Sequence, residues 1–410
     1  MGRNTIETLL FRGLSTPIAL LLVVVQSRFL APEGRGTFVL AVLSVTIASR
    51  LLGQLGLAVT ARTRERGLEL RHLILRAFAL AAAFGAVGAG AVVVLAAVTE
   101  IPTDVALIAA AALVPNVIWQ SVSGVLLGQA RVRVWNLIQG LSPLATLVGM
   151  LAFVVWLGSG VRGAVVAWTL AHVLTAALAL AVSRDLWLPL ARPVLFDEHG
   201  RTLLRLALAM GAVQVVTLIG YRAELFVLEL STGVAAVGVY SIAMQAAEAL
   251  WLIPAAIATA ITGTVVHDQE ADARRLVRMS AFKSLLYTGA AAAIVGGAGP
   301  WVIPLLFGDD FEQAARPLAL LLPGVVLYAP VTVLVVYFSV RHARPHLSLV
   351  VAIAAAAVTT VLALLLIPRY GMEGAAVASA LGYAAGSALA LGLFTMAFPS
   401  VLAPDDPTSR

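Results

Sequence analysis

Twelve apolar runs, each long enough to cross a lipid bilayer, follow one another through the 410-residue chain. A membrane-spanning helix needs about 20 consecutive, mostly apolar residues. Hydrophobic residues make up 61% of the sequence and charged residues only 12%, far from the composition of a soluble domain. The sequence therefore predicts an all-α, polytopic membrane protein. The runs lie at 8–30, 36–60, 73–98, 103–128, 134–157, 162–184, 203–229, 234–266, 279–303, 314–340, 346–367 and 373–398.

The positions of the basic residues predict the orientation of these spans. Cytoplasmic loops of membrane proteins carry an excess of Lys and Arg. With the N-terminus in the cytoplasm, twenty of the 27 Lys and Arg residues fall on the cytoplasmic side, five fall outside, and Arg50 and Arg222 lie within spans. We therefore expect a multi-pass protein of the plasma (inner) membrane with both termini cytoplasmic. The arginines are spread between apolar runs, which argues against nucleic acid as a partner.

Two similar stretches, 160–180 and 371–391, indicate that the chain is duplicated. They are identical at ten of 21 aligned positions, and each lies at the end of its own half. Tandem halves of a very hydrophobic chain are typical of transporters, in which two bundles enclose a central path. We predict an N-terminal six-helix bundle at 1–184, a cytoplasmic linker at 185–201 and a C-terminal six-helix bundle at 202–410.

Several segments resemble a known family when they are taken in order. The segments are SRFLAPEGRGTF (27–38), LGQLGLAVTAR (52–62), VGVYSIAMQAAEALWLIPAAI (237–257), LFGDDFEQAARPLALLLPGVVLYAP (306–330) and IPRYGMEGAAVASALGY (367–383). They are similar to the polysaccharide flippases, including the O-antigen-type exporters, of the multidrug/oligosaccharidyl-lipid/polysaccharide (MOP) superfamily.

The resemblance implies a MATE-like fold of about 12 transmembrane helices in two pseudo-symmetric six-helix bundles around a cavity that opens alternately to either side. It also implies export of a polyprenyl-(pyro)phosphate-linked oligosaccharide from the cytoplasmic to the outer leaflet for cell-surface polysaccharide assembly. Membrane lipid and polysaccharide-assembly proteins are the expected partners. Lipid II flippases of the superfamily commonly have fourteen spans, which argues modestly against lipid II as the substrate.

Charged residues inside spans are costly and by default mark a function. Arg50 lies fourteen residues after Gly36, and Glu248 lies ten residues after Gly238, in segments that align with each other. At about 1.5 Å per residue, their depths of about 21 and 15 Å are similar. Arg50 is suited to bind a phosphate and Glu248 to exchange a proton; the alternative is a static ion pair between the two.

Three further charges and several polar residues complete the predicted substrate-binding set. Arg222 and Glu224 are two residues apart and therefore point to different sectors of one helix, where snorkelling or gating is the alternative to substrate contact. Arg12 either snorkels to cytoplasmic headgroups or first captures the phosphate. The polar candidates, each with a helix–helix hydrogen bond as the alternative, are Gln54, Asn116, Gln120, Asn136, Gln139, Gln214, Tyr221, Tyr240 and Gln245.

We expect no enzymatic activity, no cofactor and no metal ion. The sequence has no cysteine and no GxxxxGK[ST] motif, and His342 and His346 lack metal-ligand spacing. The first alternative function is a cation-coupled multidrug exporter of the same fold. The first six spans contain no acidic residue apart from Asp104 at the very start of the run 103–128, which favours an anionic substrate instead. A membrane enzyme acting on the lipid carrier is less favoured because the external loops are short, and an assembly scaffold remains a third alternative.

Overall fold

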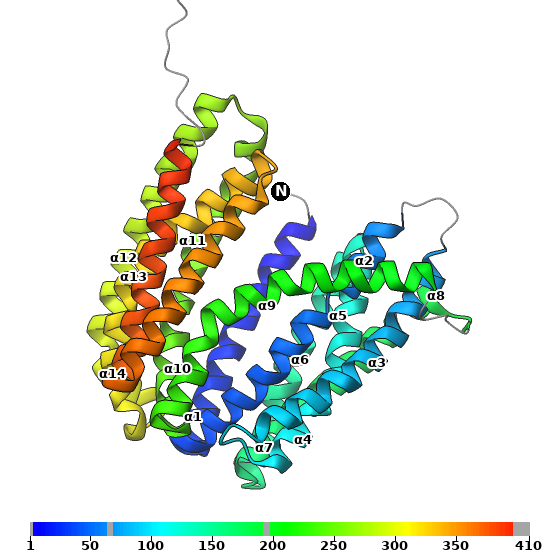
Figure 1. Ribbon diagram of the computed structural model, residues 1–410, viewed down its shortest axis with the longest axis horizontal. Helices are drawn as coiled ribbons and strands as arrows, with labels where there is room; N and C mark the ends of the chain where they lie inside the picture. Colours follow the sequence, from blue (N-terminus) through cyan, green and yellow to red (C-terminus); the bar gives the residue numbers. More distant parts are fainter. Residues whose placement is uncertain (1–2, 64–68, 192–196, 397–410) are drawn as a thin grey trace, which may run out of the picture. The chain divides into compact units, whose positions relative to one another are not determined.

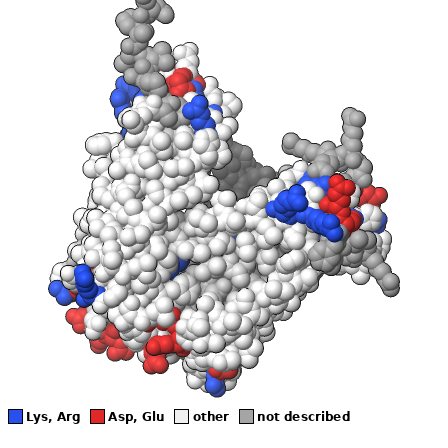
Figure 2. All heavy atoms as spheres, viewed as in Figure 1, with Lys and Arg blue, Asp and Glu red and all other residues white. Residues whose placement is uncertain are grey.

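The computed structural model describes residues 3–63, 69–191 and 197–396, with side chains described from residue 17 onward. Within these ranges the chain forms helices and turns and no β-strand, which confirms the all-α prediction (Figure 1). Ten helical stretches of this described part are long and apolar enough to cross a membrane. On the face drawn in Figure 2, charged side chains gather toward the helix ends and leave a broad uncharged surface between them. Such a surface is expected where the protein contacts lipid.

The ten stretches correspond to the twelve predicted apolar runs, because the two longest helices each contain a reversal. Helices α1 (Arg3–Leu52) and α14 (Pro345–Met396) have 50 and 52 residues, or about 75 Å each, against a hydrocarbon core of about 30 Å. A residue with positive φ interrupts each helix: Ala31 (φ 54°, ψ 174°) and Gly371 (φ 54°, ψ −131°). Figure 1 shows the chain turning back within both helices. Each therefore supplies two antiparallel spans.

Arg35 fastens the reversal in α1. Its side chain is fully buried, and Nη1 donates hydrogen bonds to Oε1 of Gln26 at 3.0 Å and to the carbonyl oxygen of Val23 at 3.4 Å. Both acceptors lie on the limb that precedes the reversal. Arg35, which lies between the first two predicted spans, therefore stabilises the strained backbone at Ala31 from inside the protein.

The chain forms two compact units. Unit 1 contains Met1–Ile219, Thr232–Gly238 and Leu306–Phe311, and unit 2 contains Gly220–Ser231, Val239–Leu305 and Glu312–Arg410. These units differ from the predicted bundles mainly in that the first part of α9 (Glu198–Thr232) belongs to unit 1. Two contacts hold it there: Nη1 of Arg62 donates to the carbonyl oxygen of His199 at 3.1 Å, and Arg76 pairs with Asp197.

The remaining helices of unit 1 follow the predicted spans closely. They are α2 (Leu55–Arg62), α3 (Leu70–Ala96), α4 (Thr103–Ala110), α5 (Leu113–Gly128), α6 (Val132–Met150) with a π-helical end (Leu151–Trp156), α7 (Gly160–Val182) and the short α8 (Arg184–Trp187). A core of Val122, Leu126, Ile138 and Ala179 joins α5, α6 and α7.

Unit 2 contains the later helices and the second part of α9. They are α10 (Val234–Ala249), which begins in unit 1, α11 (Leu252–His267), α12 (Glu270–Phe307), a 3-10 turn (Asp309–Ala314), α13 (Ala315–Val335) with a π-helical end (Val336–Arg341), and α14. Helix α13 packs along α14, where a buried hydroxyl of Ser387 donates to the carbonyl oxygen of Leu327 at 2.6 Å.

Two spans that correspond under the duplication are interrupted part-way along their length. The second span passes from α1 to α2 through a turn at residues 53–54, and the eighth passes from α10 to α11 through a turn at residues 250–251. At the second interruption the amide of Trp251 donates to the carbonyl oxygen of Glu248 at 2.9 Å, a bond of 3-10 type. Arg50 and Glu248 therefore each lie in the last turn of a helix.

The glycines that align these two spans also meet in unit 1. A Cβ atom added to Gly36 would fall 1.9 Å from the carbonyl oxygen of Val234, and one added to Gly238 would fall 1.9 Å from that of Pro32. The contact is the same from either side, as expected for a pair related by internal pseudo-symmetry. Any side chain at either position would separate the two backbones.

The duplicated turns carry an ion pair each, with the charges exchanged. In unit 1, Arg162 at the start of α7 pairs with Asp104 at the start of α4. In unit 2, Glu373 of α14 occupies the position that aligns with Arg162, and its Oε1 lies 3.1 Å from Nη1 of Arg316 at the start of α13. The two halves thus repeat one connection in opposite polarity.

Candidate functional site

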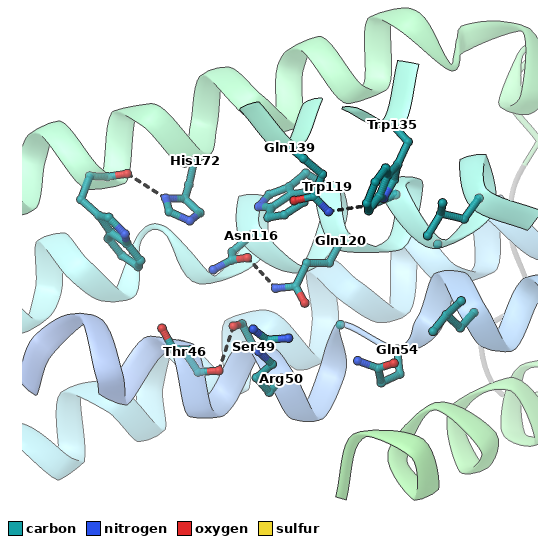
Figure 3. A pocket seen from close by; sticks show the side chains of 16 residues that line it. Thr46, Ser49, Arg50, Gln54, Asn116, Trp119, Gln120, Trp135, Gln139 and His172 are labelled. Carbon is teal, nitrogen blue, oxygen red and sulfur yellow. Dashed lines mark hydrogen bonds between the residues drawn. The ribbon is translucent and has the colours of Figure 1, made fainter. Parts of the chain in front are cut away.

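Unit 1 contains a cavity of about 390 Å³ beside the interruption between α1 and α2 (Figure 3). Helices α1, α2, α5, α6 and α7 form its walls. Neither Asp nor Glu is among its sixteen lining residues. Its polar and aromatic lining comprises Thr46, Ser49, Arg50, Gln54, Asn116, Trp119, Gln120, Ser123, Trp135, Gln139, Trp168 and His172.

Arg50 is the charged group of this cavity. Its side chain is exposed, and among the described residues none forms a hydrogen bond or an ion pair with it. Its place in the last turn of a helix is favourable, because the helix C-terminus carries partial negative charge. A guanidinium that keeps its charge in a membrane span without a protein counterion is suited to bind an anion.

Amide groups form the wall opposite Arg50. Nε2 of Gln120 donates to Oδ1 of Asn116 at 2.6 Å, and Nε2 of Gln139 donates to Oγ of Ser123 at 3.4 Å. Figure 3 shows Asn116 and Gln120 facing the wall that carries Ser49 and Arg50. Four of the polar residues predicted to line a path, namely Gln54, Asn116, Gln120 and Gln139, are thus brought together with Arg50.

Gly53 makes this arrangement of the amides possible. A Cβ atom at this position would lie 2.2 Å from Oε1 of Gln120 and 2.8 Å from the carbonyl oxygen of Ser49. Glycine therefore allows Gln120 to approach the interruption closely.

The tryptophans of the cavity were not among the residues predicted from the sequence. The indole N–H groups of Trp119 and Trp135 are buried and have no hydrogen-bond partner in the described part of the chain. His172 also lines the cavity; its Nδ1 lies 2.8 Å from the carbonyl oxygen of Trp168, and the centroids of the two rings are 4.3 Å apart. Trp119 follows Asn116 by three residues and therefore shares a helix face with it, so its place in the cavity could have been predicted from the sequence.

In unit 2, Arg222 and Glu248 form a bidentate pair. Nη1 and Nη2 of Arg222 lie 2.6 and 2.8 Å from Oε1 and Oε2 of Glu248. Nη1 also lies 2.7 Å from the sulfur of Met244. Glu248 therefore pairs with Arg222, and not with Arg50 as the sequence had suggested as an alternative. Both of its carboxylate oxygens are bound by Arg222.

Glu224 lies on the same helix as Arg222 but is almost completely buried, as expected from their different helix sectors. It interacts electrostatically with Arg222 and Glu248. Oε2 of Glu224, Oη of Tyr240 and Oγ of Ser379 are buried, and the hydroxyl of Ser379 lies close to the other two groups. These three side chains form a polar cluster in the apolar interior of unit 2.

Four aromatic side chains of unit 2, those of Tyr221, Trp251, Tyr328 and Tyr383, pack against one another. Tyr221 contacts Trp251 and Tyr383 at centroid distances of 5.9 and 6.1 Å, and Oη of Tyr221 lies 3.1 Å from Oη of Tyr328. The indole N–H of Trp251 is buried and has no partner in the described structure. Of these four rings, the sequence had suggested only Tyr221.

The remaining predicted site residues, Asn136, Gln214, Gln245 and Arg12, are not among the residues that line the unit 1 cavity. Gln245 is half-buried on α10, one turn before Glu248, and does not line the unit 1 cavity. Arg12 belongs to α1, but its side chain lies outside the described residues. Within the described ranges, no group of three or more His, Cys, Asp or Glu residues could hold a metal ion.

Comparisons with known proteins agree with this architecture. The sequence model of a family described as "Polysaccharide biosynthesis protein" matches residues 1–264. No curated protein matches the chain.

Solved structures of transporters have a similar fold. An inward-facing multidrug resistance MATE family transporter of the MOP superfamily is 17% identical, with a TM-score of 0.76 over 93% of this chain and 94% of that one. The lipid II flippase MurJ, in an inward closed conformation, is 12% identical, with a TM-score of 0.81 over 96% of this chain and 88% of that one. A MOP superfamily transporter from Pyrococcus furiosus, described as having a binding pocket of reverse polarity, is 17% identical, with a TM-score of 0.63 over 96% and 94% of the two chains. At these identities the likeness shows the fold.

Proposed function

The chain belongs to the polysaccharide biosynthesis protein family, and from this membership we propose that it is a flippase for a lipid-linked oligosaccharide. It carries the polyprenyl-(pyro)phosphate-linked glycan from the cytoplasmic to the outer leaflet for cell-surface polysaccharide assembly. The expected membrane is the plasma (inner) membrane, with both termini in the cytoplasm. No covalent chemistry is required of the protein, because the substrate crosses the membrane unchanged.

The observation that carries this proposal is the unpartnered Arg50 in a cavity without a carboxylate. The guanidinium supplies paired donors for a phosphate oxygen pair. Amides and free indole N–H groups supply hydrogen bonds, and the indole rings supply apolar faces for a sugar ring. A cavity of about 390 Å³ is at the small end of ligand-binding cavities, so it holds one or two sugars and not a whole repeat unit.

The fold supports transport by alternating access of two bundles. The duplicated halves and the interrupted second and eighth spans are features of transporters whose binding sites form near the membrane midplane. Glu248 is the expected coupling group, since it is a carboxylate with a side chain 21% exposed inside a span.

A cation-coupled multidrug exporter is the alternative function, because two of the similar solved structures are described as multidrug resistance transporters. An organic cation requires negative charge in its site. The unit 1 cavity has one arginine and no carboxylate among its lining residues, so an anionic substrate fits it better.

Substitution of Arg50 tests the proposal. In a strain that lacks the chromosomal gene, Arg50→Ala should abolish surface polysaccharide and leave lipid-linked intermediates in the cytoplasmic leaflet. Arg50→Lys should retain part of the export, because lysine keeps the charge but loses the paired donors. The measurement is glycan staining of intact cells together with immunoblotting of the membrane fraction.

Arg316→Ala is the matched control, since it removes an arginine that is 84% exposed and pairs at a helix start. It should export normally. Normal surface polysaccharide in the Arg50→Ala strain would remove this cavity from the transport path and with it the basis of the proposed function.

A further inference from the structure

We infer that His172 is a fixed hydrogen-bond acceptor in the unit 1 cavity, and that it selects a sugar which presents an O–H or N–H donor to it. The inference rests on the proposed function, because the ligand in question is the sugar of the lipid-linked oligosaccharide. It adds a residue that determines specificity to the groups that bind the substrate in this cavity.

The hydrogen bond at Nδ1 determines which nitrogen of His172 carries a proton. Nδ1 lies 2.8 Å from the carbonyl oxygen of Trp168, one turn earlier on α7. A carbonyl oxygen only accepts, so Nδ1 is protonated and donates this bond. In a neutral imidazole the second nitrogen, Nε2, then has a free lone pair and is an acceptor.

The surroundings of the ring keep it neutral. His172 is 7% exposed, and neither Asp nor Glu is among the residues that line the cavity. Arg50 already supplies a positive charge to the same cavity. A second positive charge, buried in a span without a carboxylate partner, would be costly. Nε2 therefore accepts a hydrogen bond and does not donate one.

Two contacts hold this acceptor in place. The ring centroids of His172 and Trp168 are 4.3 Å apart at an interplanar angle of 49°, and the bond at Nδ1 fixes how the imidazole is turned. Figure 3 shows the ring of His172 pointing into the cavity. Among the described residues, none forms a hydrogen bond with its Nε2. A side chain that is already held in one orientation loses little entropy when a ligand binds, so Nε2 is prepared for a donor that the ligand supplies.

The polarity of the fixed groups shows which part of the substrate faces His172. The oxygens of an ionised phosphate only accept, so a phosphate cannot form a hydrogen bond with Nε2. The indole N–H groups of Trp119 and Trp135 only donate, and they have no partner in the described part of the chain. A sugar is complementary to both kinds of group, because each hydroxyl donates and accepts and an acetamido group has an N–H and a carbonyl oxygen. His172 therefore faces the sugar and not the phosphate.

Binding measurements on the purified full chain in zwitterionic lipid nanodiscs test the inference. The probes are a short-chain isoprenyl pyrophosphate without a sugar, the same compound bearing one glucose, and the same compound bearing one N-acetylglucosamine. We expect the wild-type protein to bind at least one sugar-bearing probe about 2- to 10-fold more tightly than the sugar-free probe, as one neutral hydrogen bond provides. A preference for the N-acetylglucosamine probe assigns the donor to an amide N–H, whereas a preference for the glucose probe or equal binding of both assigns it to a hydroxyl group.

Substitutions of His172 separate the acceptor from the packing of the ring. His172→Phe keeps a flat ring against Trp168 and removes Nε2. It should abolish the preference for the sugar-bearing probes and leave the affinity for the sugar-free probe unchanged. His172→Gln places an amide oxygen, which is also an acceptor, near the position of Nε2 and should retain part of the preference.

Thr175→Val is the matched control. Thr175 is fully buried one turn further along α7, is not among the residues that line the cavity, and donates from Oγ1 to the carbonyl oxygen of Ala171 at 2.7 Å. Like His172→Phe, this substitution removes a hydrogen bond from a side chain to the backbone of α7. It should leave the binding of all three probes unchanged. Circular dichroism and the elution volume in size-exclusion chromatography show whether each variant is folded.

The inference fails if the wild-type protein binds the sugar-bearing probes no more tightly than the sugar-free one, or if the folded His172→Phe protein keeps the wild-type preference. It also fails if His172→Phe weakens the binding of all three probes equally, because the residue would then only shape the cavity. Binding of the sugar-free probe that is lost in Arg50→Ala tests the proposed function separately. A negative result at His172 alone therefore leaves that function standing.

Discussion

Replacement of Gly53 by alanine should separate the stability of unit 1 from its transport function. The added Cβ would lie 2.2 Å from Oε1 of Gln120, far inside van der Waals contact, so the amide must rotate away. Gln120 then loses its 2.6 Å hydrogen bond to Asn116 and its place in the cavity. The carbonyl oxygen of Ser49, a backbone atom 2.8 Å from the new Cβ, must also shift, which adds strain.

The expected change in stability is small because two effects oppose each other. Loss of one neutral hydrogen bond costs about 0.5–1.5 kcal/mol. Replacing glycine by alanine at a position without positive φ stabilises by about 0.5–1 kcal/mol, mainly by reducing the entropy of the unfolded chain. We therefore expect a net change in unfolding free energy within about 1 kcal/mol. Substrate binding loses the amide contact, and export should fall by about 2- to 10-fold.

Thermal unfolding of the purified protein and surface polysaccharide in complemented cells measure the two effects separately. The matched control is Gly90→Ala in α3, where a Cβ atom would have no heavy atom within 4 Å. It should stabilise the protein by about 0.5–1 kcal/mol and leave export unchanged. Wild-type export by a stably inserted Gly53→Ala protein would refute the assignment of Gln120 to the substrate path.

Two further predictions concern other parts of unit 1. Trp119→Phe and Trp135→Phe each keep an aromatic face and remove a free indole N–H. Each substitution should weaken export by about 2- to 10-fold without changing membrane insertion. Wild-type export by both variants would mean that these N–H groups do not contact the substrate. The hydrogen bonds from Arg131, at 3.1 and 2.5 Å, hold the pKa of the Asp185 carboxyl below its ordinary value. A lowered pKa means that this pair stabilises the folded protein above the unfolded pKa of about 3.9 and that the contribution is lost as the pH falls toward the folded value. The side chains of this pair are 36% and 52% exposed, so its contribution to stability is below about 1 kcal/mol. Asp185→Asn should therefore lower the thermal midpoint slightly at neutral pH and leave it unchanged in strong acid. An equal decrease of the midpoint at both pH values would exclude the ion pair as its cause.

The features that depend on composition and local spacing could be predicted from the sequence. The twelve spans follow from runs of apolar residues, and the duplication was inferred from the similar stretches 160–180 and 371–391. The grouping of Gln54, Asn116, Gln120 and Gln139 with Arg50 was foreseen only as a set of path-lining candidates. Polar groups within spans are energetically costly, so they can be chosen as site candidates without knowledge of the fold.

The partners of the charged residues could not be predicted in the same way. The pairing of Arg222 with Glu248 depends on how α9 and α10 are rotated against each other, and no periodicity within either helix contains that information. The interruptions at residues 53–54 and 250–251 were also missed, because the apolar runs continue through them. The buried position of Arg35 was not predicted either, because it depends on the positive φ at Ala31, which is unusual for alanine.

The exchanged ion pairs of the two halves suggest how easily the duplicated copies could diverge. Conversion of one polarity into the other requires two substitutions, and an intermediate carrying only one of them holds two like charges. Arg162 and Asp104 are 71% and 43% exposed, and Arg316 and Glu373 are 84% and 44% exposed. At such exposure an ion pair is worth about 0–1 kcal/mol, so the intermediate would have lost little stability. The reversal is therefore the kind of change that drift alone can fix, in contrast to the buried glycine pair, where no single substitution leaves the two backbones in contact.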